Sequence, residues 1–181
     1  SMAKSSGILT TLLADCFESL NPDVIVLLGD RFETHATATT ALLMNIPIAH
    51  IHGGEVTQGA VDEQLRHAIT KMSYLHFCST DVYRKRVIQM GEDASKVFNV
   101  GAPGIDNMIN MGLLTRDDLN KQLDWSLPQR FALFTYHPAT LEDGDLNQDL
   151  DSIFDTLLKI DIGILFTYAN ADFGGNIINN R

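Results

Sequence analysis

The run Val24-Ile-Val-Leu-Leu-Gly-Asp-Arg31 decides the fold of this chain. Its first five residues are all apolar and do not alternate with polar ones, which is typical of a strand buried on both faces. Strands of this kind belong to parallel sheets that are covered by helices. Gly29, Asp30 and Arg31 then turn the chain, so polar side chains are expected where this strand ends.

Helical and strand patterns alternate at short intervals around this run. The expected helices cover residues 2–19, 34–45, 61–72 and 81–90, and the expected strands cover residues 24–28, 47–51, 74–78 and 97–100. Alternation of this kind gives βαβ units, in which a helix connects two parallel strands. The sequence therefore predicts the α/β class with a doubly wound parallel sheet.

A second unit follows the break at Gly101-Ala-Pro-Gly104, where we place a domain boundary between residues 1–103 and 104–181. The later part is expected to hold helices at 105–111, 115–123 and 146–160 and strands at 131–136 and 162–166. Two strands are fewer than the about four to six of a typical sheet. The first unit has no strand before residue 24, so we expect both units to be truncated.

Composition favours a folded protein that does not bind nucleic acid. Of the 181 residues, 45% are hydrophobic and 20% are charged, which supplies enough apolar material for a core. The net charge of −10 argues against a nucleic-acid partner, since affinity for phosphate backbones comes from lysine and arginine. A small anionic ligand is compatible with this charge, because it meets only local cations and helix N-termini.

Cysteine usage and hydropathy point to the cytoplasm. Cys16 and Cys78 lie in apolar runs without CxxC spacing, so we expect two buried thiols rather than a zinc site or a disulfide. The apolar runs are too short for a membrane span, and no signal-peptide pattern opens the chain. We therefore expect a cytoplasmic protein without a membrane partner.

Polar clusters follow three of the expected strands. Asp30-Arg31 follows the strand at 24–28, His52-Gly-Gly-Glu55 follows the strand at 47–51, and His137 follows the strand at 131–136. Ligands of open α/β sheets bind outside the carboxyl ends of the strands. Three such ends, spread over both units, predict a cleft between the units.

A fourth cluster, Asp62-Glu-Gln-Leu-Arg-His67, opens an expected helix. Asp62 and Arg66 are four residues apart, as are Glu63 and His67, so each pair shares a side of the helix. The spacing alone favours charge pairs on a solvated face, with the acidic residues at the helix N-terminus.

Two kinds of chemistry use these residue types. One is a metal-dependent phosphoesterase, with Asp30, His50 and His52 as ligands, but the additional Asp-x-His and Asn-His ligand pairs do not occur. The other is metal-free sugar-nucleotide chemistry, in which carboxylates and histidines act as acids and bases and arginine contacts the diphosphate.

Three runs together resemble hydrolysing UDP-N-acetylglucosamine 2-epimerases of sialic-acid and legionaminic-acid biosynthesis. They are Leu28-Gly-Asp-Arg-Phe-Glu33, Asn45-Ile-Pro-Ile-Ala-His-Ile-His-Gly-Gly-Glu55 and Asp62-Glu-Gln-Leu-Arg-His-Ala-Ile-Thr-Lys71. The resemblance implies a glycosyltransferase-B-like architecture of two Rossmann-like domains. Residues 1–103 would be the C-terminal part of the first domain, and residues 104–181 the N-terminal part of the second, nucleotide-binding domain.

The resemblance also implies a reaction and its partners. UDP and N-acetylmannosamine would be released from UDP-N-acetylglucosamine and water, by anti elimination of UDP across C1–C2 and hydration of the resulting glycal. The family implies a UDP-sugar as the partner, no cofactor and no metal, and a homodimer or homotetramer.

Site residues are carried over by position. The catalytic positions would be matched by Asp30, Asp62, Glu63 and His137, with His52 and Glu55 as the two choices for the C2 base. The substrate-binding positions would be matched by Arg31, Arg66, His67 and Asn170.

His52 departs from the family pattern. Relatives often place glutamate there, in His-x-Glu-Gly-Gly, whereas histidine exchanges protons near neutral pH. Some bacterial relatives with His-x-His-Gly-Gly-Glu act on a UDP-2,4-diacetamido-2,4,6-trideoxyglucose, so this substrate is an alternative. A non-catalytic fragment that binds a sugar nucleotide is a further alternative.

Overall fold

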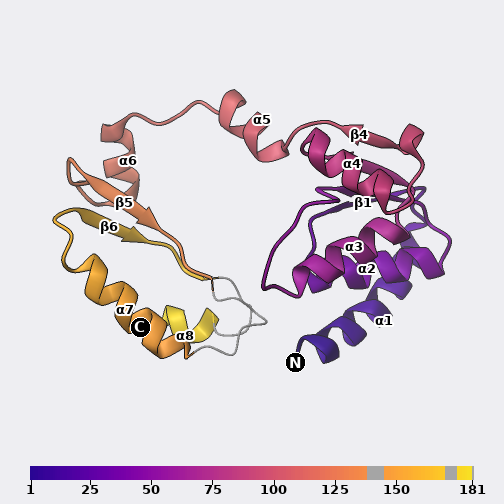
Figure 1. The fold of residues 1–181 in the computed structure, drawn as a ribbon, viewed down its shortest axis with the longest axis horizontal. Coiled ribbons are helices and arrows are strands. Elements are labelled where there is room, and N and C mark those ends of the chain that lie inside the picture. Colours follow the sequence, from indigo (N-terminus) through magenta and orange to yellow (C-terminus); the bar gives the residue numbers. More distant parts are fainter. Residues whose placement is uncertain (138–144, 170–174, 181) are drawn as a thin grey trace. The chain divides into compact units, whose positions relative to one another are not determined.

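The computed structural model describes residues 1–137, 145–169 and 175–180. Contacts within the chain divide it into two compact units, Ser1–Asn110 and Met111–Arg181 (Figure 1). The assignment of residues 1–103 and 104–181 to two domains of a larger architecture stays a prediction. None of the helices in the described ranges is long and apolar enough to cross a membrane.

The first unit contains a four-stranded parallel sheet in the order β1-β2-β3-β4. Its strands are β1 (Ile25–Leu28), β2 (Ile48–Ile51), β3 (Leu75–Cys78) and β4 (Val97–Asn99). Its helices are α1 (Met2–Leu20), α2 (Phe32–Leu43), α3 (Asp62–Met72), α4 (Asp81–Gln89) and α5 (Pro103–Asn110), with a 3-10 turn at Ala94–Lys96. The predicted parallel α/β fold is confirmed.

One face of this sheet carries the core of the unit. Strand register places Leu27 beside His50, His50 beside His76, and His76 beside Val97, so these four side chains share a face. The buried core residues on this face and on the helices packed against it are Phe17, Leu27, Ala38, Ala41, Ile48, Ile69, Cys78, Val87 and Val97. They come from α1, α2, α3 and α4 as well as from the strands.

The opposite face of the sheet is apolar and largely exposed. Val26 is 62% exposed, Leu28 58%, Phe98 42% and Val100 53%. The prediction that residues 24–28 are buried on both faces is therefore wrong for Val24, Val26 and Leu28. Right-handed crossovers between strands taken in sequence order place α2, α3 and α4 on the same face. Among the described elements, no helix covers the opposite face of the sheet, so helices pack on one face only.

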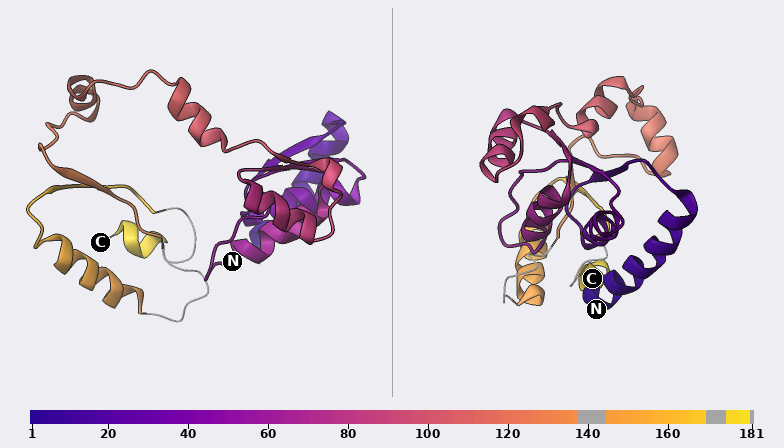
Figure 2. Two further views of the ribbon diagram at one scale, coloured as in Figure 1. Left: turned by 45° about the horizontal axis from the view of Figure 1, so that its top comes forward. Right: turned by 90° about the vertical axis from the view of Figure 1, so that its right-hand side faces the viewer.

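Helix α1 packs on α2 through one side only. Figure 2 shows α1, in indigo, leading from the N-terminus into the unit. Phe17 is buried against α2, whereas Ile8, Leu12 and Leu20 are 60–69% exposed, as one stripe at a spacing of four residues. Cys16 lies in this stripe and is exposed, so its predicted burial is wrong, while the predicted burial of Cys78 is confirmed.

The second unit contains two parallel strands, β5 (Phe131–Phe134) and β6 (Gly163–Phe166), with Phe131 opposite Gly163. Its helices are α6 (Arg116–Leu123), α7 (Leu146–Leu157) and α8 (Gly175–Asn179). Helix α7 begins after Asp145, whose side chain accepts from the backbone N–H groups of Asn147 and Gln148. The predicted β-α-β unit is confirmed.

Candidate functional site

Polar side chains gather at the carboxyl edge of the four-stranded sheet. Because β1, β2 and β3 are parallel, the residues that follow them meet at one edge. We call the group of side chains there the edge cluster, which consists of Asp30, His52, Glu55, Thr57, Glu63, Arg66 and Ser79. Its hydrogen bonds form two sets, around Arg66 and around Glu55, and the charge of Arg66 acts on Glu55. Five of these seven residues are sequence-predicted site residues, and the fold brings them together.

Arg66 joins α3 to the end of β1. Its Nη2 donates to Oδ2 of Asp30 and, at 3.1 Å, to Oγ1 of Thr57. The side chain of Arg66 is only 7% exposed, so the solvated face expected from its spacing is wrong for this residue. Its Nε and Nη1 are also buried and have no hydrogen-bond partner within the described ranges. The geometry makes Arg66 a support for the Asp30 carboxylate.

Glu63 holds the segment that leads into α3. Its Oε2 accepts from the backbone N–H of Thr57 at 3.1 Å, and its Oε1 lies 4.0 Å from Nε2 of His67. The expected pairing of Glu63 and His67 is therefore present. Asp62, half-buried, is the first residue of α3, where a carboxylate interacts favourably with the helix dipole.

A line of polar contacts runs from the loop after β2 to the end of β3. Nδ1 of His52 lies 2.6 Å from Oε1 of Glu55, and Oγ of Ser79 donates to the same oxygen at 2.5 Å. An ionised carboxylate only accepts hydrogen bonds, so the proton of a neutral His52 belongs on Nδ1. Within the described residues, both hydrogen bonds of the Glu55 side chain end on Oε1.

The environment of Glu55 favours its ionised form. Burial by itself would raise the pKa of this carboxyl. The hydrogen bonds from Ser79 and His52, together with the positive charge of Arg66, outweigh that effect and bring the pKa of Glu55 below its ordinary value. At neutral pH the carboxylate therefore presents a fixed negative charge to the imidazole of His52.

The loop between His52 and Glu55 has a conformation that suits few residues. His52 has φ 68° and Gly54 has φ 81°, both in the left-handed region. A Cβ on Gly54 would lie 2.5 Å from the backbone oxygen of Tyr83 on α4. Arg86 on α4 donates through Nη1 to the backbone oxygen of Gly54. The loop is thus pressed against α4, which fixes the position of Glu55.

His50 is buried beneath this edge and stays neutral. Its Nε2 donates to the backbone oxygen of Gly29 at 2.8 Å, and its Nδ1 accepts from Oγ1 of Thr70 at 3.2 Å. Burial lowers the pKa of His50 to about 4, because the charged imidazolium loses its hydration there. His50 is therefore a packed histidine whose two ring nitrogens are both satisfied.

Arg31 lies on the more exposed side of the same edge. Its Nε is 3.3 Å from Oε2 of Glu33, and both side chains are more than one-third exposed. Its predicted contact with a diphosphate stays a prediction. No group of three or more His, Cys, Asp or Glu side chains in the described part of the chain is arranged to hold a metal ion.

In the second unit, polar residues follow β5 and β6. His137 is exposed and follows β5 after Thr135 and Tyr136. The hydroxyl groups of Thr135 and Thr167 are 2.6 Å apart, which links the carboxyl ends of the two strands. The other predicted residue of this unit, Asn170, lies outside the described residues.

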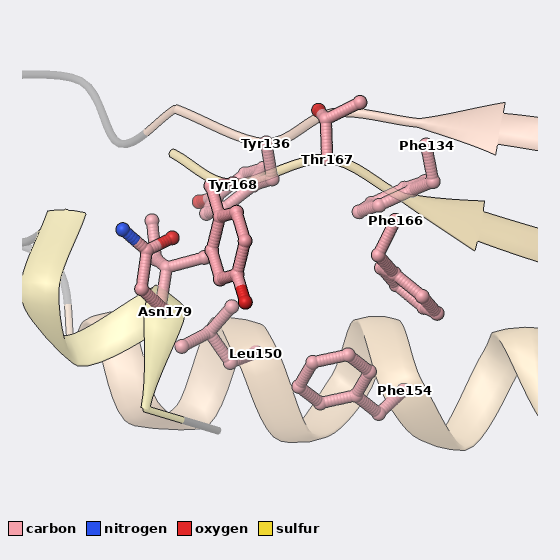
Figure 3. Close-up of a pocket in the computed structure, with 9 residues that line it drawn as sticks. Phe134, Tyr136, Leu150, Phe154, Phe166, Thr167, Tyr168 and Asn179 are labelled. Atoms are coloured by element: carbon pink, nitrogen blue, oxygen red, sulfur yellow. The ribbon is translucent and has the colours of Figure 1, made fainter. Parts of the chain in front are cut away.

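A cavity of about 410 Å³ lies beside these strand ends, between β5, β6, α7 and α8 (Figure 3). Its walls are mostly aromatic or aliphatic: Phe134, Tyr136, Leu150, Phe154, Phe166, Thr167, Tyr168, Ile178 and Asn179. The side-chain amide of Asn179 is bonded to the backbone N–H and oxygen of Ala169, at 2.7 and 3.1 Å. The cavity contains none of the sequence-predicted site residues.

Sequence reasoning missed Thr57 and Ser79. Ser79 follows β3 at the same edge as Asp30 and His52, so the rule that identified those residues would also have found it. A serine directly before a helix also suits a helix cap, but Thr80 fills that role by accepting from the backbone N–H of Tyr83. Thr57 lies in a loop, where no periodic pattern marks it.

Comparison with known proteins gives relatives over almost the whole chain. The chain is 41% identical, over 99% of its length, to a GDP/UDP-N,N'-diacetylbacillosamine 2-epimerase (hydrolyzing) of Campylobacter jejuni. It is 39% identical, over 98% of its length, to a UDP-N,N'-diacetylbacillosamine 2-epimerase (hydrolyzing) of Legionella pneumophila. In each case it covers 47% of the relative, so the chain spans about half the length of these proteins.

The fold is also found among solved structures. The UDP-GlcNAc 2-epimerase of Methanocaldococcus jannaschii, in complex with UDP-GlcNAc and UDP, matches with a TM-score of 0.80 at 20% identity. The match covers 99% of this chain and 51% of that one. The chain therefore has the α/β fold of about half of a glycosyltransferase-B-like structure.

The family follows from the sequence match. The family model described as UDP-N-acetylglucosamine 2-epimerase matches residues 1–181. The chain belongs to the UDP-N-acetylglucosamine 2-epimerase family.

Proposed function

We propose that the full-length protein is a hydrolysing UDP-sugar 2-epimerase that acts on UDP-2,4-diacetamido-2,4,6-trideoxyglucose. The supporting observation is the identity of 41% and 39% to two hydrolysing 2-epimerases named for N,N'-diacetylbacillosamine, a sugar of this type. UDP-N-acetylglucosamine, the substrate first expected from the sequence, is the second candidate. The Methanocaldococcus jannaschii protein, which is named for UDP-GlcNAc, is 20% identical to this chain.

The proposed reaction is elimination followed by hydration. A base removes the proton at C2, the C2–H electron pair forms the C1=C2 bond, and the C1–O bond breaks so that UDP leaves. Water then adds to the glycal: its hydroxyl bonds to C1, and a proton bonds to C2. This proton is added on the face opposite the one from which the first proton was removed, so C2 is inverted. Because the C2–H bond is weakly acidic, this chemistry needs a well-positioned base.

The edge cluster offers the residue types that these steps require. We assign acid and base steps to Asp30, Asp62 and Glu63, with His137 of the second unit facing the sugar or the diphosphate. Arg31 is assigned to the leaving diphosphate, where a cation stabilises the developing charge. Arg66 and His67, first expected to bind substrate, are assigned to supporting contacts with Asp30 and Glu63, which fits the burial of Arg66.

The test is NMR of the full-length protein with each UDP-sugar in deuterated water. We expect free UDP and a 2-epimerised diacetamido sugar that carries deuterium at C2, with slower turnover of UDP-N-acetylglucosamine. Faster turnover of UDP-N-acetylglucosamine would make the second candidate the substrate. Binding of both compounds without turnover would favour the non-catalytic alternative. A homodimer or homotetramer is also proposed, and light scattering of the same sample tests it.

A further inference from the structure

We propose that His52 is the C2 base and acts through Nε2, while Glu55 and Ser79 are positioning residues that hold its imidazole. This inference rests on the proposed function, and it chooses between the two residues that the sequence left open. It starts from the contacts of the edge cluster, in which His52, Glu55 and Ser79 form one line of hydrogen bonds.

The geometry separates the two ring nitrogens of His52. Nδ1 is held by Glu55 at 2.6 Å, which places the proton on Nδ1 and the lone pair on Nε2. Nε2 makes no hydrogen bond within the described residues, and the side chain is 22% exposed at the carboxyl edge. An imidazole whose second nitrogen is fixed by a carboxylate presents a defined lone pair, the arrangement that general-base catalysis needs.

Glu55 is the less suitable base of the two. Its Oε1 already accepts from both His52 and Ser79. A carboxylate stabilised in its ionised form binds a proton weakly, whereas the proton affinity of imidazole suits transfer near neutral pH. Ser79 is anchored at the foot of α4, between the end of β3 and the cap residue Thr80, so it fixes Glu55 from a rigid element.

The charged and titratable groups around this line come from four elements. They are His50 on β2, Arg66 on α3, Cys78 on β3 and Arg86 on α4, in addition to Glu55 on the loop itself. Burial raises the pKa of the Cys78 thiol to about 11, so this group stays neutral. His50 stays neutral, and the two arginines are engaged with Asp30 and with the backbone of Gly54. Glu55 is therefore the negative charge that stabilises the imidazolium formed when His52 takes a proton.

The step is a simple proton transfer within the proposed elimination. The C2–H bond breaks, its proton moves to Nε2 of His52, and its electron pair forms the C1=C2 bond. The C1–O pair leaves with UDP. Water regenerates the neutral imidazole by accepting the proton, directly or through the hydration step.

Chemical rescue in the full-length protein tests this assignment. Glycine tolerates the φ of 68° at residue 52, so His52→Gly removes the imidazole with the least disturbance of the loop. We expect turnover and C2 deuterium incorporation to fall at least about 100-fold. Added imidazole should restore at least a tenth of the wild-type rate. UDP binding at unchanged affinity would show that the variant is folded.

Two further variants identify the positioning residues. In Glu55→Gln the amide oxygen still accepts from Nδ1, but the negative charge is gone, so protonation of the imidazole becomes harder. We expect a 10- to 100-fold loss that imidazole does not rescue, with the acidic limb of the pH–rate profile moved to lower pH. Ser79→Ala should lose about 3- to 10-fold, because Glu55 loses the hydrogen bond that fixes its carboxylate. The acidic limb should move toward higher pH, because the pKa of Glu55 rises when this hydrogen bond is lost.

Equal turnover of His52→Gly and wild type, or a loss in His52→Gly that imidazole does not restore, would overturn the proposal. A wild-type protein that turns over neither sugar nucleotide would instead refute the proposed function.

Discussion

The guanidinium of Arg66 donates to the carboxylate of Asp30, although 36 residues separate them in the sequence. The contact ties the first turns of α3 to the end of β1. Replacing one member of a buried ion pair leaves the other without compensation, which typically costs several kcal/mol.

Arg66→Met is expected to destabilise the full-length protein by about 3 kcal/mol, because Asp30 loses its partner in a mostly buried position. Urea denaturation measures the loss. In the double variant with Asp30→Asn, part of this loss should disappear, since the uncompensated charge is gone. Strictly additive losses in the two single variants would contradict a direct coupling between these residues.

Gly54→Ala is expected to destabilise the protein more than Gly29→Ala. Both glycines have φ above 80°, so each alanine is strained by about 1 kcal/mol. A Cβ on Gly29 meets no atom within 4 Å, whereas a Cβ on Gly54 would meet the backbone oxygen of Tyr83 at 2.5 Å. The additional loss in Gly54→Ala is expected to be about 2 kcal/mol. Equal midpoints in urea would mean that the loop does not depend on its contact with α4.

Asp30→Asn and Asp62→Asn are expected to reduce turnover of the UDP-sugar sharply, by at least about 100-fold, while UDP affinity changes little. The amide keeps the shape of the carboxylate but cannot act as an acid or a base. Steady-state kinetics and calorimetric titration with UDP give the two quantities. A variant that keeps wild-type turnover removes its residue from the catalytic assignment.

His50 makes the stability of the protein depend on pH. Its pKa is about 4 in the folded state and 6.5 when exposed, so below pH 6.5 the unfolded chain binds a proton that the folded one does not. Stability therefore falls as the pH decreases from 6.5 to 4, by about 3 kcal/mol from this group alone. Urea denaturation at several pH values should show a flatter dependence for His50→Gln. An unchanged dependence would mean that His50 does not carry the effect.

The exposed apolar face of the sheet is expected to make the 181-residue chain self-associate. Val26 and Phe98 lie on this face, so replacing both by threonine should reduce the apparent mass in light scattering. Val82→Thr is the matched control, because Val82 is also 62% exposed but lies on α4. A monodisperse wild-type monomer would contradict this prediction.

The sequence predicted most of the fold because its apolar periodicity is strong. Every predicted strand is found, and the predicted helices differ from the observed ones mainly at their ends, where fraying and capping set the boundary. Exposure was predicted less well. Val26 and Leu28 look like core residues in the sequence, but whether an apolar side chain is covered depends on which face the neighbouring helices occupy.

The site was predicted in its parts but not in its contacts. The strand-end rule brought Asp30, His52 and Glu55 to one edge without the structure. The burial of Arg66 and the hydrogen bond from Ser79 to Glu55 depend on how α3 and α4 pack against that edge. Such packing is set by tertiary contacts that no local spacing records.

Because the four strands β1-β2-β3-β4 are parallel, the segments that connect them to the helices are of two kinds, at opposite ends of the strands. Segments that leave the strands form the edge cluster, whereas segments that return from the helices, at residues 44–47, 73–74 and 90–96, enter the sheet at its opposite edge. A length change in a returning segment therefore leaves the polar edge in place. Within these segments residues 93–95 are exposed, whereas Ser73 is buried, so residues 93–95 are the suitable place for inserting an affinity tag or a fluorescent reporter.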